Sequence, residues 1–102
     1  MDIDDYAAWA ANVARVPSGG TMDRERLSYL ALGLTGEAGE VADLVKKLLR
    51  DGERAWSPEH VAEELGDLIY CWSALCAAVG RSPSDVLAAS RAKIEARIAK
   101  RD

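Results

Sequence analysis

The sequence has no phenylalanine, only three prolines and only two cysteines. The core therefore has to be built from Leu, Val, Ile and Ala, together with three Trp and three Tyr. A composition rich in Ala and Leu and poor in proline favours α-helix. Cys71 and Cys76 lie five residues apart in a segment that we predict to be helical, so their side chains project in different directions. We expect two buried thiols and no disulfide between them.

Long apolar runs are also missing. No stretch approaches the roughly 20 residues that a membrane-spanning helix requires. Met1 is followed by Asp2, Asp4 and Asp5, with Ile3 between them, whereas a secretory signal begins with basic residues. We therefore expect a cytoplasmic protein that does not bind membranes.

Basic residues are in deficit, with 13 Lys and Arg against 17 Asp and Glu and a net charge of −4. Proteins that hold nucleic acid through its phosphates need a basic surface, so we expect no nucleic-acid partner. A protein of this charge that handles phosphate groups needs a cation to offset the repulsion.

Proline, glycine and helix-capping residues divide the sequence into segments. Turn residues occupy positions 17–20, a glycine stop follows Asp51, and Ser-Pro start signals stand at 57–58 and 82–83. They predict helices over residues 4–15, 22–51, 58–79 and 84–100, and no segment shows the alternation of a strand. A chain of 102 residues fits one domain, since domains run from about 50 to 250 residues. The expected architecture is an all-α four-helix bundle in a single domain over residues 1–102.

Acidic residues interrupt the apolar stripes of the two central helices. Glu37 stands where the stripe of the second helix requires an apolar residue, and Glu64 lies inside the stripe of the third. Glu40 and Asp67 lie at the edges of these stripes, each three residues after its partner. Like charges three residues apart on a helix repel each other. One reading is that each pair is a solvated face; the other is that both pairs face a common cation.

The types of these residues favour Mg²⁺ among possible cations. Mg²⁺ prefers oxygen ligands and keeps several waters, so carboxylates combined with substrate phosphate oxygens suit it. Di-iron bundles also use helix carboxylates, but they require a Glu-x-x-His motif on each of two helices. The one histidine, His60, does not follow a stripe Glu by three residues. We therefore do not expect iron chemistry, and we expect His60 to be solvated or to contact substrate.

Two segments carry a resemblance to a known family. The segment GLTGEAGEV at residues 33–41 and the segment EELGDL at residues 63–68 place 23 residues between Glu40 and Glu64. This pattern resembles the MazG-like nucleotide pyrophosphohydrolases, over residues 6–97. The resemblance implies a MazG-like all-α fold that hydrolyses a nucleoside triphosphate to the monophosphate and pyrophosphate. It also implies that Glu37, Glu40, Glu64 and Asp67 are catalytic and bind Mg²⁺, with Mn²⁺ as a substitute.

Five further residues are expected to bind the substrate. Lys47 follows Glu40 by seven residues on nearly the same helix face, so its amine can reach a phosphate. The spacing of Lys93 and Arg97 resembles a basic pair in the last helix of the family, although both residues also suit a solvated helix C-terminus. Trp9 and Trp56 can stack on a nucleobase or serve in packing. The base and the sugar, including deoxy or modified forms, stay open.

The lengths of the apolar stripes suggest more than one subunit. A second helix of this length overhangs a compact chain, and apolar surface is expected on both central helices. The residues concerned are Leu44, Leu48, Trp72, Leu75 and Val79. Members of the family typically form dimers or tetramers, so we expect a homo-oligomer, most simply a dimer. The alternative function is a regulatory helical bundle that binds nucleotide or a protein partner without turnover.

Overall fold

The computed structural model describes residues 1–14 and 23–101. Its four helices are α1 (Ile3–Val13), α2 (Asp23–Asp51), α3 (Pro58–Ala78) and α4 (Pro83–Arg101), with a short 3₁₀ turn η1 (Glu53–Ala55) between α2 and α3. Across these residues there is no β-strand. The predicted all-α class and its four helices are confirmed, with boundaries that differ by at most one residue where they can be compared. The predicted ends at residues 15 and 22 lie outside the described residues.

The helices begin and end on local signals that the sequence carries. Asp2 caps α1 by accepting a hydrogen bond from the Asp5 backbone N–H at 2.8 Å. Ser57 caps α3 in the same way, accepting from the His60 backbone N–H at 3.2 Å, and proline occupies the first turn. After α3 the chain turns at Gly80, whose φ of 72° is readily adopted only by glycine.

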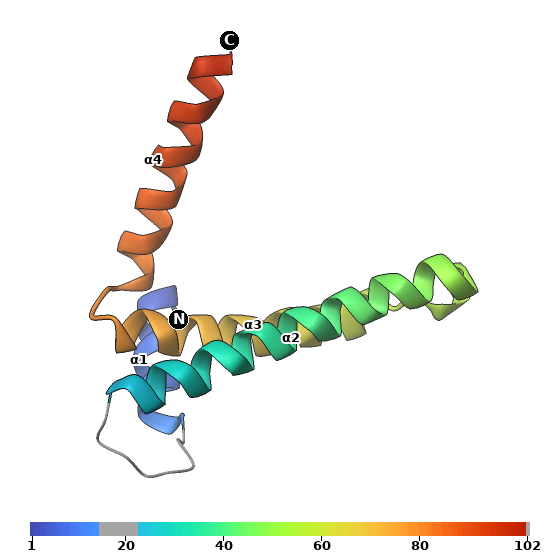
Figure 1. Cartoon of the computed structure of the whole chain (residues 1–102), viewed down its shortest axis with the longest axis horizontal. Coiled ribbons are helices and arrows are strands. Elements are labelled where there is room, and N and C mark those ends of the chain that lie inside the picture. The colour runs from blue at the N-terminus through green and yellow to red at the C-terminus, as the bar shows by residue number, and fades with distance from the viewer. Residues whose placement is uncertain (15–22, 102) are drawn as a thin grey trace.

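α2 and α3 lie side by side as an antiparallel hairpin, and α1 crosses the C-terminal half of α3 (Figure 1). α1 and α3 contact each other, and the residues buried on them include the small Ala7 and Ala10 of α1 and Ser73 and Ala74 of α3. Small side chains let two helix axes approach closely. α1 is thereby held beside the face of the hairpin that carries the acidic residues.

α4 projects away from the other three helices (Figure 1) and contacts α1 and α3. The Asp4 carboxylate of α1 accepts hydrogen bonds from the Ser84 backbone N–H at 2.9 Å and from the Ser84 hydroxyl at 2.6 Å. The radius of gyration is 16.4 Å, whereas a compact chain of about 100 residues has about 13 Å. The fourth helix therefore does not cover the hairpin of its own chain.

Large apolar side chains are consequently exposed on several helices. The exposed fractions are 47% for Leu87, 49% for Ile94 and 41% for Ile98 on α4, and 55% for Val79 at the end of α3. Leu44, Leu48, Trp72 and Leu75 are half-buried. Within the described part of the chain, no helix is both long and apolar enough to cross a membrane.

Candidate metal centre

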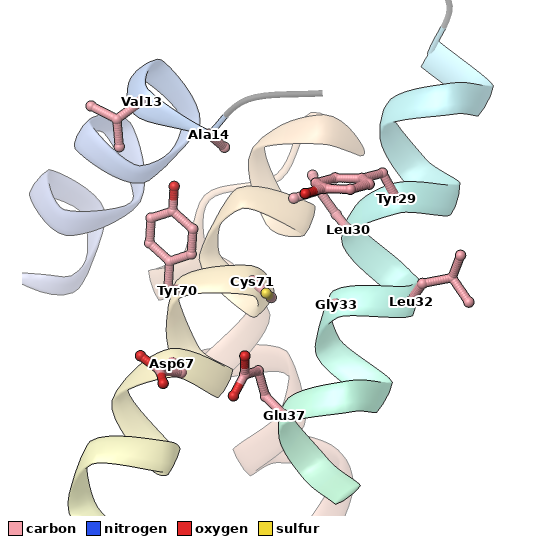
Figure 2. A pocket seen from close by; sticks show the side chains of 10 residues that line it. All are labelled: Val13, Ala14, Tyr29, Leu30, Leu32, Gly33, Glu37, Asp67, Tyr70 and Cys71. Carbon is pink, nitrogen blue, oxygen red and sulfur yellow. The ribbon is translucent and has the colours of Figure 1, made fainter. Parts of the chain in front are cut away.

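Three of the four predicted acids meet at one point between α2 and α3. One carboxylate oxygen each from Glu37, Glu64 and Asp67 lies within 4.8 Å of the other two. Figure 2 shows the Glu37 side chain reaching from α2 toward α3, which carries Asp67. The antiparallel pairing brings the acids together because Glu37 and Glu64, which interrupt the two apolar stripes, lie at the same level along the hairpin.

Glu40 is not part of this group. It is exposed on α2, one turn beyond Glu37 and about 60° around the helix. Its charge still reaches the group, since it is one of the contributions that raise the pKa of Glu37. The sequence pattern placed Glu40 correctly at the edge of the seam, but the structure does not bring its carboxylate to the meeting point.

The electrostatics of the group fit a cation. Burial raises the pKa of Glu37, and the charge of Asp67 and a hydrogen bond with Glu64 raise it further. Glu37 and Glu64 are half-buried and Asp67 is exposed. Three hard oxygen donors that repel one another at one point form a donor set suited to Mg²⁺ or Mn²⁺.

His60 lies beside the acid group, whereas the sequence predicted only that it is solvated or contacts substrate. Its Nε2 is 3.6 Å from Oε1 of Glu64, one turn away on α3, and its side chain is 53% exposed. The residue is thus solvated and also neighbours an acid of the site.

A pocket of about 650 Å³ opens beside the acids. Glu37 and Asp67 line one part of it, and the rest of its wall is apolar or aromatic (Figure 2). The full lining consists of Val13, Ala14, Tyr29, Leu30, Leu32, Gly33, Glu37, Asp67, Tyr70 and Cys71. Anionic oxygens next to an apolar and aromatic wall suit a ligand with a metal-bound polar end and a flat, weakly polar end.

Comparison with known proteins assigns the chain to a family. The model of the MazG nucleotide pyrophosphohydrolase domain matches residues 25–101. The chain belongs to the MazG family. The MazG match contains all four predicted acids and begins after α1, so Trp9 lies outside it.

A relative of the chain is found in a phage. The gene 37 protein of Mycobacterium phage L5 is 42% identical over 74 residues, which cover 69% of this chain and 65% of the phage protein. The chain thus spans slightly less than two thirds of that relative's length. No solved structure matches the chain significantly.

The basic residues predicted to contact phosphate do not line the pocket of this MazG chain. The Lys47 amine is 3.0 Å from the carboxylate of Asp43, with which it forms an exposed ion pair. Lys93 and Arg97 are exposed on α4, which points away from the hairpin (Figure 1). Within one chain, the structure does not bring these three cations to the acids.

The two predicted tryptophans do not line the pocket either. Trp56 is half-buried after η1. Trp9 is 53% exposed, and its ring contacts those of Tyr6 and Tyr70. The aromatic side chains in the pocket are instead Tyr29 and Tyr70, which sequence reasoning missed. A usable signal was present, since Tyr70 follows Asp67 by one helical turn.

Both cysteines are free thiols, as predicted, but the prediction that both are buried is wrong for Cys71. Cys76 is buried, whereas Cys71 is half-buried and lines the pocket. Burial raises the pKa of the Cys71 thiol, and the charges of Glu37 and Asp67 raise it further. Cys71 is therefore held in its protonated form beside the acids.

Proposed function

We propose that this chain is a Mg²⁺-dependent nucleoside triphosphate pyrophosphohydrolase that releases pyrophosphate and the monophosphate. The observation that carries the proposal is the meeting of Glu37, Glu64 and Asp67 at the edge of a pocket with an apolar and aromatic wall. Membership of the MazG family supports the same reaction class.

The three acids have the role of holding the metal. Mg²⁺ bound there would neutralise phosphate charge and lower the pKa of an attacking water. Glu40 is exposed and one turn from Glu37, so its carboxylate is free to join the ligands or to accept the proton of that water. The apolar wall holds the nucleoside and excludes solvent from the reacting end.

The first test measures pyrophosphate release from a panel of ribo- and deoxyribonucleoside triphosphates. Glu64→Gln should lower kcat/KM by about 100-fold or more, because even outer partners of metal ligands are worth about 10- to 100-fold. Glu63→Gln is the matched control, since Glu63 is the exposed neighbour of Glu64 on the same helix. Equal activity of the two variants would contradict the assignment of the acids.

Metal dependence is tested by chelation. Excess EDTA should abolish turnover, and Mg²⁺ or Mn²⁺ should restore it. Glu40→Gln separates the two roles of Glu40: a ligand role raises the metal concentration needed for half activity, whereas a proton-accepting role lowers kcat at saturating metal. Undiminished turnover in EDTA would reject the metal-dependent mechanism.

The bond that breaks is identified from the products. Attack at the α-phosphorus gives monophosphate and pyrophosphate, and separating the nucleotides after partial turnover should show no diphosphate intermediate. Diphosphate together with orthophosphate as primary products would contradict the proposal.

The position of Glu40 outside the acid group favours one alternative. With three acids the chain can bind a metal–nucleotide complex as a regulatory module without hydrolysing it. Tight binding of a nucleotide without pyrophosphate release, at saturating Mg²⁺ and across the panel, would establish this alternative.

A further inference from the structure

The lining of the pocket has a charged part and an aromatic part. Figure 2 shows the Glu37 and Asp67 carboxylates in one region and the rings of Tyr29 and Tyr70 in another, with Gly33 and Cys71 between them. Along α2, Glu37 and Tyr29 are eight residues apart, which corresponds to about 12 Å, whereas on α3 Tyr70 follows Asp67 by three residues, or about 4.5 Å. The pocket therefore offers a metal end and an aromatic end to one ligand.

Between the charged part and the aromatic part of the pocket, α2 and α3 approach each other closely at Gly33 and Cys71. A Cβ atom on Gly33 would lie 3.0 Å from Sγ of Cys71, a distance that would force the thiol to move. Glycine at this position lets the Cys71 side chain lie against the backbone of α2. The two ends are therefore joined without a bulky side chain between them.

Tyr70 is held from α1 by an aromatic contact. The Trp9 ring lies 5.9 Å from the Tyr70 ring, centroid to centroid, at an interplanar angle of 68°, which is an edge-to-face arrangement. Tyr6 packs against Trp9 at 5.6 Å. Neither Trp9 nor Tyr6 lines the pocket, whereas Tyr70 does. Trp9 thus limits the rotation of the Tyr70 ring without occupying the ligand space.

We propose that Tyr70 contacts the base of the nucleoside triphosphate and that Trp9 is the positioning residue that fixes the orientation of the Tyr70 ring. This inference rests on the proposed function, because it requires the phosphates to lie at the acids. Tyr70 offers a flat ring for stacking and a hydroxyl that donates or accepts a hydrogen bond. The ring supplies affinity for any base, and the hydroxyl supplies a preference among bases.

The experiment measures binding without turnover. Calorimetric titration with α,β-imido analogues of the common nucleoside triphosphates, in saturating Mg²⁺, gives the Kd of each variant. Tyr70→Ala should raise the Kd by about 5- to 150-fold, the range that stacking of a base on an aromatic ring is worth. Tyr70→Phe should keep most of the affinity and change the order of preference among bases.

Inorganic tripolyphosphate, which has no base, separates recognition from structural damage. Its affinity in Mg²⁺ should be the same in wild type, Tyr70→Ala and Trp9→Leu. Tyr6→Phe is the matched control for Tyr70→Phe, because it removes the same hydroxyl from a tyrosine that does not line the pocket. Its Kd for every analogue should equal that of wild type.

The positioning role of Trp9 requires that its effect pass through Tyr70. Trp9→Leu should raise KM and leave kcat unchanged, whereas the KM of Trp9→Phe should be close to that of wild type. In a Tyr70→Ala background, Trp9→Leu should cause no further rise in KM. An unchanged Kd in Tyr70→Ala, no binding of any analogue by wild type, or an equal loss for tripolyphosphate would overturn the inference. Tyr70-dependent binding without pyrophosphate release would instead uphold the inference and reject the proposed hydrolysis.

Discussion

At the scale of single residues, Glu37 shows the conflict between folding and chemistry most clearly. It occupies a position of the α2 stripe where a leucine would continue the apolar seam. Its neighbours across the seam, Glu64 and Asp67, are acids as well. Residues of this kind are retained at functional sites at a cost in stability.

We therefore expect Glu37→Leu to stabilise the metal-free protein while abolishing activity. The substitution restores the stripe and removes repulsion with Asp67, a gain on the order of 1 kcal/mol. Urea denaturation in EDTA measures it. Glu63→Leu, at an exposed position of α3, should give no such gain, and a destabilised Glu37→Leu would contradict the account.

Ser73 presents a buried polar atom on α3. Its side chain is 0% exposed, and its hydroxyl has no hydrogen-bond partner among the described residues. Ser73→Ala should raise the free energy of unfolding by about 1 kcal/mol, because an unpaired buried hydroxyl costs about that much. Ser28→Ala, at an exposed position of α2, controls for helix propensity. A gain no larger than that of the control would show that the hydroxyl is paired after all.

At the scale of elements, the Asp4–Ser84 contact joins the two helices at opposite ends of the chain. Hydrogen bonds from the Ser84 hydroxyl and backbone N–H lower the pKa of the Asp4 carboxyl below its usual 3.8. A lowered pKa in the folded state means that the carboxylate stabilises the fold above pH 3.8 and that this stabilisation is lost as the pH falls through the lowered pKa.

The thermal midpoint of Asp4→Ala should consequently lie below that of wild type at pH 7. The difference should shrink as the pH falls below 3.8, the usual pKa of an aspartate. Ser84→Ala should also lower the thermal midpoint in the same pH range. The double variant should have a midpoint little below that of either single variant, because both substitutions remove the same contact. A difference that is constant from pH 7 to pH 2 would show that the charge of Asp4 has no part in it.

Most features of the individual helices could be predicted from the sequence. Caps and turns are local, so the four helices were predicted with boundaries close to those observed. The phase of Glu37 against Glu64 followed from the period of 3.6 residues per turn. The contact of Trp9 with Tyr70 was not predictable, because it depends on how α1 crosses α3, and the sequence contains no measure of that angle.

At the scale of the whole molecule, the exposed apolar stripe of α4 is the main reason to expect a homo-oligomer. Its stripe of Leu87, Ile94 and Ile98 is exposed along a helix that stands apart from the hairpin (Figure 1). Exposed apolar stripes of this kind mark interfaces, and symmetric dimers are the commonest solution. A second copy would also be needed for Lys93 or Arg97 to approach an acid group, because α4 carries them away from its own.

We predict a homo-oligomer, most simply a dimer, by light scattering at micromolar concentration. Ile94→Glu should lower the mass towards the 11.0 kDa of one chain, because it places a charge on the stripe. Ala92→Glu is the matched control, since position 92 is exposed on the opposite side of α4. An active wild-type preparation with the mass of one chain would contradict the prediction.

The sequence by itself determined the helices, the apolar stripes and the acids that interrupt them, because caps, turns and periodicity act within a few residues of one another. The tertiary structure decided which of these features meet. It brought Glu37, Glu64 and Asp67 together and left Glu40 outside, because which edge residue reaches the seam depends on how α2 and α3 pack against each other. It also placed Tyr70 rather than Trp9 in the pocket and directed α4 away from the hairpin, since packing angles between helices depend on contacts between residues distant in sequence.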